Sequence, residues 1–521
     1  MALDSKQEIR SLLEQRKQQD QFTLLNQLPQ PDLFKDMAKA TQRVVDAIHN
    51  QETITIVGDY DVDGVVSTTI VVDFFTQNGI KVNWIVPNRF IHGYGLSPKI
   101  VEQINDGLII TVDNGISAHQ AASLAKAKGC DVIITDHHTV GETLPPCFAV
   151  VNPKQDDCAF PYKDICGAQV AWYFCASIKK ALNLQTNMMD FFDILTLAII
   201  ADVMPMRSLN AAIVKKGLQL MSNSKRPALQ TLKNYLKKSS FNEEDVGFFI
   251  APLINCAGRM DDASKAVQFL LSNDKREIDK TLSFLIDLNN KRKDEQEQIF
   301  QESLKQVDKK DEVIVVSNES WNEGIIGIVA AKLAEKFKKP SFVFSINNEK
   351  AKGSSRSITD VHLYDLLNSV SHTTVGFGGH KSAAGVVLET SQLQNFKTQI
   401  NEQIKNFQTS CEYPLQYFYK LDVNDVDFDL YNIIEEFRPY GLENETPVFY
   451  FENAHIKKQM FIGKEQRHQK IILENDIELL LFNNTNHFEE NKTISFTSTL
   501  SINEFRGNFT LNLIAREVLG Q

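Results

Sequence analysis

The sequence lacks the features that mark secreted, zinc-ribbon and membrane-spanning proteins. Its seven cysteines are odd in number and none form a CxxC pair, which argues against both a disulfide framework and a zinc ribbon. The N-terminal stretch is polar, without the apolar centre of a signal peptide, and no later apolar run approaches the length of a membrane span. We therefore expect reduced cysteines, no membrane contact and a cytoplasmic location.

A net positive charge is also absent. The formal net charge of −11 speaks against indiscriminate wrapping of nucleic acid, although local basic patches and bound cations can reverse the field where a substrate lies. We find no internal repeat and no low-complexity tract. What the chain does have is 521 residues, 43% of them hydrophobic, which is enough for about three domains with their own cores.

The first half of the chain has the pattern of a doubly wound α/β domain. After a helical N-terminal segment (1–50), short apolar runs alternate with amphipathic stretches, as in a mostly parallel sheet covered by helices. The expected strands are 53–58, 108–112, 131–135 and 149–151, and the expected helices are 64–78, 97–105 and 117–129. We assign residues 51–270 to this domain.

The second half predicts a long connecting helix (271–310), a further α/β domain (311–410) and a β-barrel domain (411–521). The connecting segment is polar with sparse apolar residues at helical spacing, as in a helix that bridges two domains. The second α/β domain contains a glycine-rich turn, GFGGHKSAAG, at 376–385. After Cys411, short alternating segments indicate an antiparallel all-β module.

Acids and histidines follow the predicted strands directly. Asp61 and Asp63 come after the first strand, Asp113 after the next and His137 after the third, while Asp202 ends an apolar helical run. Because parallel strands end at one edge of a sheet, we expect these side chains to meet there. Asp59 is the weakest member and is open to a loop hydrogen-bonding role. His138 either contacts substrate or orients its neighbours.

Crowded carboxylates resist joint ionisation, and a divalent cation relieves the repulsion. Carboxylates with imidazole and no thiolate favour Mn²⁺ or Mg²⁺, with Zn²⁺ and Fe²⁺ left open. The alternative is that each acid caps a helix or closes a turn. Four clusters at corresponding strand ends favour the metal site.

These motifs resemble those of a known family. DYDVDG, VDNG, TDHH and ADVMP, in this order, resemble the four metal motifs of the DHH phosphoesterases, and GGHKSAAG resembles the signature of their DHHA1 domain. Within that family the chain is most similar to the RecJ nucleases, and residues 412–521 match the position of their OB-fold. The segments that carry this similarity are VPNRFIHGYGLS (86–97), CAGRMDDA (256–263), WNEGIIGIVAAKL (321–333), GSSRS (353–357) and RPYGLENETPVF (438–449).

The resemblance implies an exonuclease that hydrolyses single-stranded DNA from the 5′ end to 5′-mononucleotides in DNA repair and recombination. It implies two Mn²⁺ or Mg²⁺ ions bridged by Asp113, which activate the attacking water and neutralise charge on the phosphate. Asp63, His137 and Asp202 would complete one ion's site, and Asp61 would serve the other, with His138 among the catalytic residues. A single-strand-binding protein, a helicase and a monomeric state are further expectations.

Substrate contacts are expected from a second group of residues. The resemblance places them around the 5′ end and the nearby backbone: Arg89, Arg259, Ser354, Arg356 and His380. Arginine suits phosphate because its planar fork donates two hydrogen bonds, although each arginine could instead form a surface salt bridge. In the C-terminal module, aromatics interleave with basic residues, a composition suited to gripping single strands: Phe449, Tyr450, Phe451, Phe461, Lys457, Lys458, Lys464, Arg467 and Lys470.

Two departures from the family pattern bear on substrate fit. Asn322 stands where these proteins often carry histidine, and Glu443 interrupts a turn that is usually rich in glycine. One alternative function is a DHH phosphodiesterase of short RNA or cyclic dinucleotides, which would share the metal motifs. A catalytically silent DNA-binding scaffold is another, but such relatives have lost the acids that this chain retains.

Overall fold

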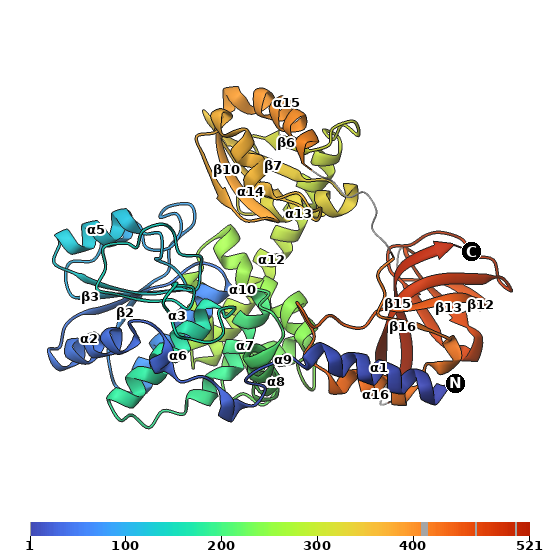
Figure 1. Cartoon of the computed structure of the whole chain (residues 1–521), viewed down its shortest axis with the longest axis horizontal. Coiled ribbons are helices and arrows are strands. Elements are labelled where there is room, and N and C mark those ends of the chain that lie inside the picture. Colours follow the sequence, from blue (N-terminus) through green and yellow to red (C-terminus); the bar gives the residue numbers. More distant parts are fainter. Residues whose placement is uncertain (1, 408–414, 464–465, 506–507, 521) are drawn as a thin grey trace.

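The computed structural model describes residues 2–407, 415–463, 466–505 and 508–520. In these ranges the chain forms an α/β domain with a helical extension, a smaller α/β domain above it and a β-barrel to one side (Figure 1). None of the helices in the described ranges is apolar enough, over the length needed, to span a membrane. The predicted boundary at residues 410 and 411 and the predicted contact residue Lys464 lie outside the described residues.

The first domain is built on a five-stranded parallel sheet in the order β2-β1-β3-β4-β5. Its strands are β1 (Ile54–Val57), β2 (Asn83–Ile85), β3 (Leu108–Val112), β4 (Asp131–Thr135) and β5 (Ala149–Val151). The order reverses between β1 and β3, and in open α/β sheets this reversal opens a crevice at the carboxyl ends of the strands. The four predicted strands are confirmed, whereas β2, with only three residues, was not predicted.

Helices cover both faces of this sheet because its strands present apolar residues alternately to each side. On β3, Ile110 and Val112 join the core beneath α2 (Met37–His49), α3 (Val62–Gln77) and α6 (Gly167–Ala181). Ile109 of the same strand joins the opposite core, beneath α4 (Pro98–Val101) and α5 (His119–Ala127). The helix expected over 97–105 is shorter than predicted because the chain turns after Val101 towards Gly107.

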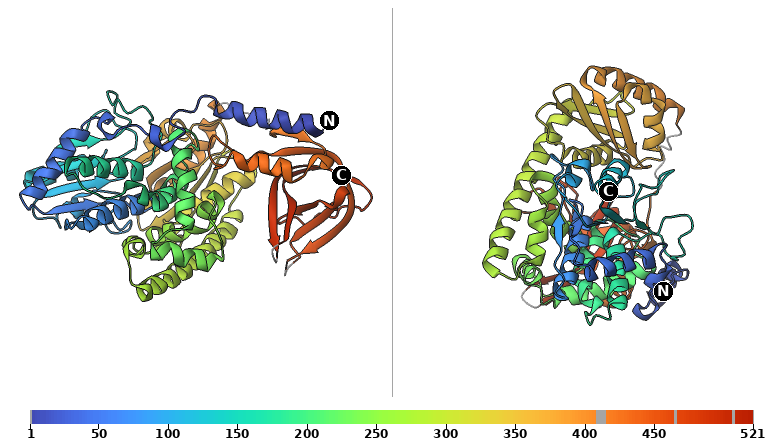
Figure 2. Two further views of the ribbon diagram at one scale, coloured as in Figure 1. Left: turned by 90° about the horizontal axis from the view of Figure 1, so that it is seen from below. Right: turned by 90° about the vertical axis from the view of Figure 1, so that its left-hand side faces the viewer.

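A helical extension follows the sheet and leads into one long helix. It contains α7 (Phe192–Ala201), α8 (Ser208–Ser222), α9 (Pro227–Leu236), a π-helical turn (Asp245–Ile250), α10 (Ala251–Met260) and α11 (Ser264–Leu271). The connecting helix α12 (Lys275–Leu304) then rises to the second domain (Figures 1 and 2). Its start packs in the core of the first domain through Leu282, and its end packs through Ile299 against Trp321 of the second domain.

The second α/β domain has the sheet order β6-β7-β8-β10-β9, with only β6 and β7 parallel. Its elements are β6 (Ile314–Asn318), α13 (Ile326–Phe337), β7 (Ser341–Asn347), β8 (Lys350–Arg356), α14 (Leu363–Ser369), β9 (Gly376–Gly379), β10 (Ala383–Glu389) and α15 (Leu393–Gln403). The glycine-rich segment predicted as a turn is mostly strand: β9 and β10 form a hairpin, and the turn itself is limited to residues 380–382.

The C-terminal module is a closed barrel of five strands, β12-β13-β14-β16-β15, with β15 returning to β12. The barrel strands are β12 (Phe449–Ile462), β13 (His468–Leu473), β14 (Glu478–Leu481), β15 (Thr493–Phe505) and β16 (Asn508–Gly520). The short strand β11 (Tyr419–Leu421) pairs with β12 outside the closed barrel. The barrel confirms the predicted architecture. The prediction of a purely antiparallel, all-β module is wrong, because β14 pairs with β16 in parallel and α16 (Phe428–Glu436) precedes the barrel.

The N-terminal segment divides between two cores. Helix α1 (Ala2–Lys17) lies along α16 beside the barrel, far along the chain from its own position (Figures 1 and 2). Ile9 and Leu13 are buried in the barrel's core, and Arg10 forms two hydrogen bonds with Glu436 at 2.6 and 2.9 Å. Helix α2 belongs instead to the core of the first domain. The two α-helices of the N-terminal segment therefore pack in different cores and do not form one unit.

Candidate metal centre

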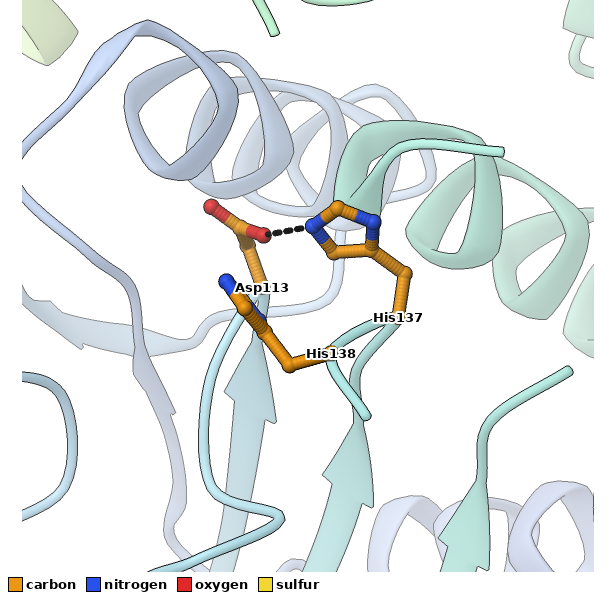
Figure 3. A group of neighbouring side chains, drawn as sticks. All are labelled: Asp113, His137 and His138. Atoms are coloured by element: carbon orange, nitrogen blue, oxygen red, sulfur yellow. Dashed lines mark ion pairs between the residues drawn. The ribbon is translucent and has the colours of Figure 1, made fainter. Parts of the chain in front are cut away.

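The predicted acids and histidines converge at the carboxyl edge of the parallel sheet. Three groups have ligand atoms within 4.8 Å of one another: Asp59 with Asp61 and Asp113, Asp63 with His137 and Asp202, and Asp113 with His137 and His138. His137 belongs to two of these groups, and its Nε2 lies 3.2 Å from Asp113 Oδ1 (Figure 3). The same nitrogen lies 3.7 Å from an oxygen of each of Asp63 and Asp202.

Hydrogen bonds from nearby backbone amides fix the orientation of the Asp61 and Asp63 carboxylates. Asp61 is the N-cap of α3 and accepts a hydrogen bond from Gly64 N. Both oxygens of Asp63 accept hydrogen bonds from the first amides of α6, those of Gly167 (2.6 Å) and Ala168 (2.8 Å). A Cβ atom on Gly167 would stand 2.3 Å from Asp113 Oδ1, so only glycine lets α6 start this close to the cluster.

Asp136, the acid of the DHH motif, organises the two histidines. Its Oδ2 accepts a hydrogen bond from Ile116 N, and its Oδ1 accepts one from His137 N. The same Oδ1 lies 2.7 Å from His138 Nδ1, which leaves Nε2 facing the hydroxyl of Tyr94 at 3.4 Å. Although burial opposes it, the hydrogen bond to Asp136 and the nearby carboxylates raise the pKa of His138 to about 9. His138 therefore presents a cation near the site at neutral pH.

The cluster's electrostatics call for a cation. Burial, and then the neighbouring carboxylates, raise the pKa values of Asp59, Asp61 and Asp113, and raise that of Asp202 to about 8. Burial lowers the pKa of His137, which keeps its imidazole neutral and able to bind metal. Three carboxylate oxygens of the cluster are buried and have no hydrogen-bond donor in the described ranges: Asp59 Oδ1, Asp113 Oδ1 and Asp202 Oδ2. Such a donor set fits Mn²⁺ or Mg²⁺.

Asp59 was predicted to be the weakest member of the candidate metal site, but its position in the structure favours a direct role there. It is 1% exposed and shares a group with Asp61 and Asp113, so it is placed to bind the second ion rather than only the loop. Its position two residues before Asp61, directly after β1, was the available signal. We expect Asp59→Asn to lower Mn²⁺ affinity and turnover about 10- to 100-fold, a loss typical of changes around a metal site. Turnover and calorimetric Mn²⁺ titration equal to wild type would return Asp59 to a loop role.

The raised pKa values predict a pH-dependent effect of metal on stability. In the metal-free protein, the stabilisation from these protonated carboxyls is full below their ordinary pKa of about 4 and is lost as pH rises through their raised values, up to about 8 for Asp202. Mn²⁺ needs the ionised carboxylates and competes with their protons. We expect Mn²⁺ to raise the melting temperature more at pH 8.5 than at pH 6. Scanning calorimetry with and without EDTA tests this, and an equal or opposite pH trend would contradict it.

Arg89 and Arg259 lie near the carboxylates of the cluster, Arg356 lies near Arg259, and none of the three forms an ion pair with the described residues. Arg89 stacks over the Tyr60 ring at 4.1 Å, and Arg259 donates to Gly324 O of the second domain at 3.2 Å. Arg356 donates to Ser354 Oγ at 3.2 Å. Burial, followed by the charge of Arg89, lowers the pKa of Arg259 to about 10, so it keeps its positive charge at neutral pH. These cations are available to phosphates.

The remaining residues predicted to contact substrate do not contact the carboxylate cluster in the described ranges. His380 is exposed in the β9–β10 turn, and no contact within the described ranges joins its side chain to the carboxylates. Asn322 holds the loop before α13 by accepting a hydrogen bond from Gly324 N. Glu443 has a φ of 62°, a conformation that favours glycine, which accounts for the glycine usual at this turn.

The barrel separates its aromatics into core and surface. Phe449 and Phe451 are fully buried core residues, whereas Phe461 is exposed. Phe482 and Phe509, which the sequence analysis did not single out, are also exposed. Of the predicted basic residues, Lys457 pairs with Asp476 and Lys470 with Glu478.

Comparison with known proteins places the chain in a family. The DHH family N-terminal domain matches residues 53–199, the DHHA1 domain matches 310–406 and the RecJ OB domain matches 419–517. The single-stranded-DNA-specific exonuclease RecJ of Haemophilus influenzae is 30% identical over 94% of this chain and 92% of its own length. RecJ of Bacillus subtilis is 33% identical, and the match spans 94% of this chain but only 64% of that relative.

Solved structures agree with the sequence matches. The crystal structure of Thermus thermophilus RecJ in complex with Mn²⁺ superimposes with a TM-score of 0.84 and 26% identity, covering all of this chain and 78% of that one. A structure of exonuclease RecJ bound to manganese has a TM-score of 0.64 and 30% identity over 73% of this chain and 96% of its own. With all three domain matches in order and the Haemophilus influenzae relative covered over 92% of its length, the chain belongs to the RecJ family of DHH phosphoesterases.

Proposed function

We propose that this chain is a metal-dependent exonuclease that releases 5′-mononucleotides from the 5′ end of single-stranded DNA, in DNA repair and recombination. The observation that carries the proposal is the position of Asp113, which lies in one group with Asp59 and Asp61 and in another with His137. A carboxylate so placed suits the bridge between two cations. Asp63, together with His137 and Asp202, would complete one site.

Two divalent cations would supply a nucleophilic water at neutral pH and neutralise charge on the scissile phosphate. The protein's own residues bind and orient the strand. Arg89 and Arg259, without ion-pair partners in the described ranges, donate to phosphate oxygens from the side of Asp59 and Asp61. Ser354 and Arg356 approach from the second domain. His138, held by Asp136 through Nδ1, would donate a hydrogen bond from Nε2 to a phosphate oxygen.

Product analysis over time with Mn²⁺ tests this function. The substrates are 5′-labelled and 3′-labelled single-stranded DNA, with duplex DNA, short RNA and cyclic dinucleotides alongside. Immediate release of labelled mononucleotide from the 5′-labelled strand, with stepwise shortening of the 3′-labelled strand, is the expected result. Consumption of only short RNA or cyclic dinucleotides would keep the metal chemistry and overturn the DNA assignment.

Single-stranded DNA is the proposed partner of the site. A single-strand-binding protein or a helicase that supplies unwound ends would suit an enzyme that requires single strands. These protein partners, the monomeric state and the cytoplasmic location stay predictions.

A further inference from the structure

Lys154 lies at the same sheet edge as the metal centre and belongs to none of the groups described above. It follows β5, which pairs in parallel with β4, so it leaves the sheet beside the strand that carries His137. Asn152 is fully buried and donates from Nδ2 to His138 O at 3.0 Å, while its Oδ1 accepts a hydrogen bond from Lys154 N at 2.8 Å. The backbone of Lys154 is therefore fixed to the loop that carries both histidines.

The ammonium group of Lys154 has no assigned role within the molecule. In the described ranges it forms no ion pair and no hydrogen bond, although Lys163 on the same connection donates to Cys158 O at 2.7 Å. An unpaired lysine beside a cluster of carboxylates has its charge available for an anionic ligand.

Lys154 and the arginines flank the cluster from different sides. Arg89 follows β2 and Lys154 follows β5, the two edge strands of the parallel sheet, so β1, β3 and β4 lie between them. Asp59, which follows β1, lies towards Arg89, whereas His137, which follows β4, lies towards Lys154. The cations are thus divided between the Asp59 side and the His137–Asp202 side.

We propose that Lys154 binds the phosphate immediately 3′ of the scissile phosphate. This inference rests on the proposed function and on the expectation, from the family resemblance, that Arg89 and Arg259 lie around the 5′ end of the strand. A strand that crosses the centre from the arginines leaves it on the side of His137 and Asp202, where the next phosphate meets the fixed Lys154 turn. Lys154 thereby sets the register of the strand without taking part in bond cleavage.

Steady-state kinetics of Lys154→Gln on single-stranded DNA test the contact. Loss of one charge-assisted hydrogen bond to a flanking phosphate should raise KM about 10- to 100-fold and leave kcat within about twofold, because the bond is made equally in ground and transition states. The slope of log(kcat/KM) against log salt should become shallower by about 0.7, as expected for one lost phosphate contact on a single strand. Lys154→Arg should restore most of the affinity.

A neutral methylphosphonate at the second linkage from the 5′ end identifies the phosphate. It should slow the wild type as much as Lys154→Gln does and slow the variant little further, because both changes remove one contact. Lys180→Gln is the matched control, since Lys180 forms an exposed ion pair with Asp32 at the far end of α6. This control should keep the wild-type KM and salt slope.

Three results would overturn the contact: an unchanged KM in Lys154→Gln, a full methylphosphonate penalty in the variant, or a loss of Mn²⁺ affinity that accounts for the defect. A wild-type protein that releases no nucleotide would contradict the proposed function itself and the contact with it. Failure of the variant alone leaves the exonuclease assignment intact, so the two failures are distinguishable.

Discussion

Replacing Asp113 with asparagine is expected to reduce hydrolysis of single-stranded DNA by about 10³-fold or more, a loss on the scale seen when a preorganised electrostatic group is removed. The change keeps the side chain's shape and removes the charge that both proposed ions share. Mn²⁺ titration by calorimetry should show weaker binding at both sites. Because burial and neighbouring carboxylates oppose the ionised form of Asp113, the metal-free variant should melt at pH 8 no lower than the metal-free wild type.

Asp131→Asn is the matched control for this experiment. Asp131 begins β4, at the opposite edge of the sheet from His137, and pairs with Arg43 at 2.7 Å. This variant should keep both Mn²⁺ binding and turnover. Normal Mn²⁺-dependent turnover in Asp113→Asn would remove Asp113 from the bridging position.

Deleting the barrel domain should weaken binding of long single strands about 10- to 100-fold, since stacking is worth about 1–3 kcal/mol per base. Cleavage of very short oligonucleotides should persist, because the metal centre lies wholly in the first domain. The deletion must also remove α1, since Ile9 and Leu13 would otherwise expose apolar surface that the barrel normally buries. Fluorescence anisotropy with strands of increasing length measures the effect.

The informative comparison is between strand lengths in the same variant. Loss of affinity only for long strands would show that the barrel binds the strand. Equal losses at all lengths would indicate damage to the catalytic domain. Affinity for long strands equal to that of the full chain would contradict the nucleic-acid role of the barrel. Phe482→Ser removes one exposed ring and leaves the buried core aromatics in place. A loss of affinity in this variant would assign strand binding to the barrel surface that carries Phe482.

The metal centre was predictable because its residues follow buried strands, whose carboxyl ends must meet in a parallel sheet. Asp61, Asp63, Asp113 and His137 were found by that rule, and Asp202 by its position after an apolar helix. The same rule applies to Asp59, which was undervalued because an acid in a tight loop so often bonds the loop backbone.

Contacts between segments far apart in the sequence could not be predicted from the sequence alone. The α1–α16 packing joins residues more than 400 positions apart in the sequence, and local periodicity carries no information about such a partner. The hydrogen bond from Arg259 to Gly324 O likewise depends on how two domains meet. Strand β2 was not predicted because its three residues, Asn83–Ile85, begin with a polar residue and are only partly buried, whereas the equally short β5 is a continuous buried apolar run.

Helix α12 has a consequence for how the chain tolerates changes in length. A helix of 30 residues spans about 45 Å, and each residue adds a rotation of about 100°. One inserted residue would therefore rotate the second domain relative to the first by about 100°, while seven would nearly restore its orientation but add about 10 Å of separation. The number of residues in α12 therefore sets both the distance and the relative rotation of the two domains.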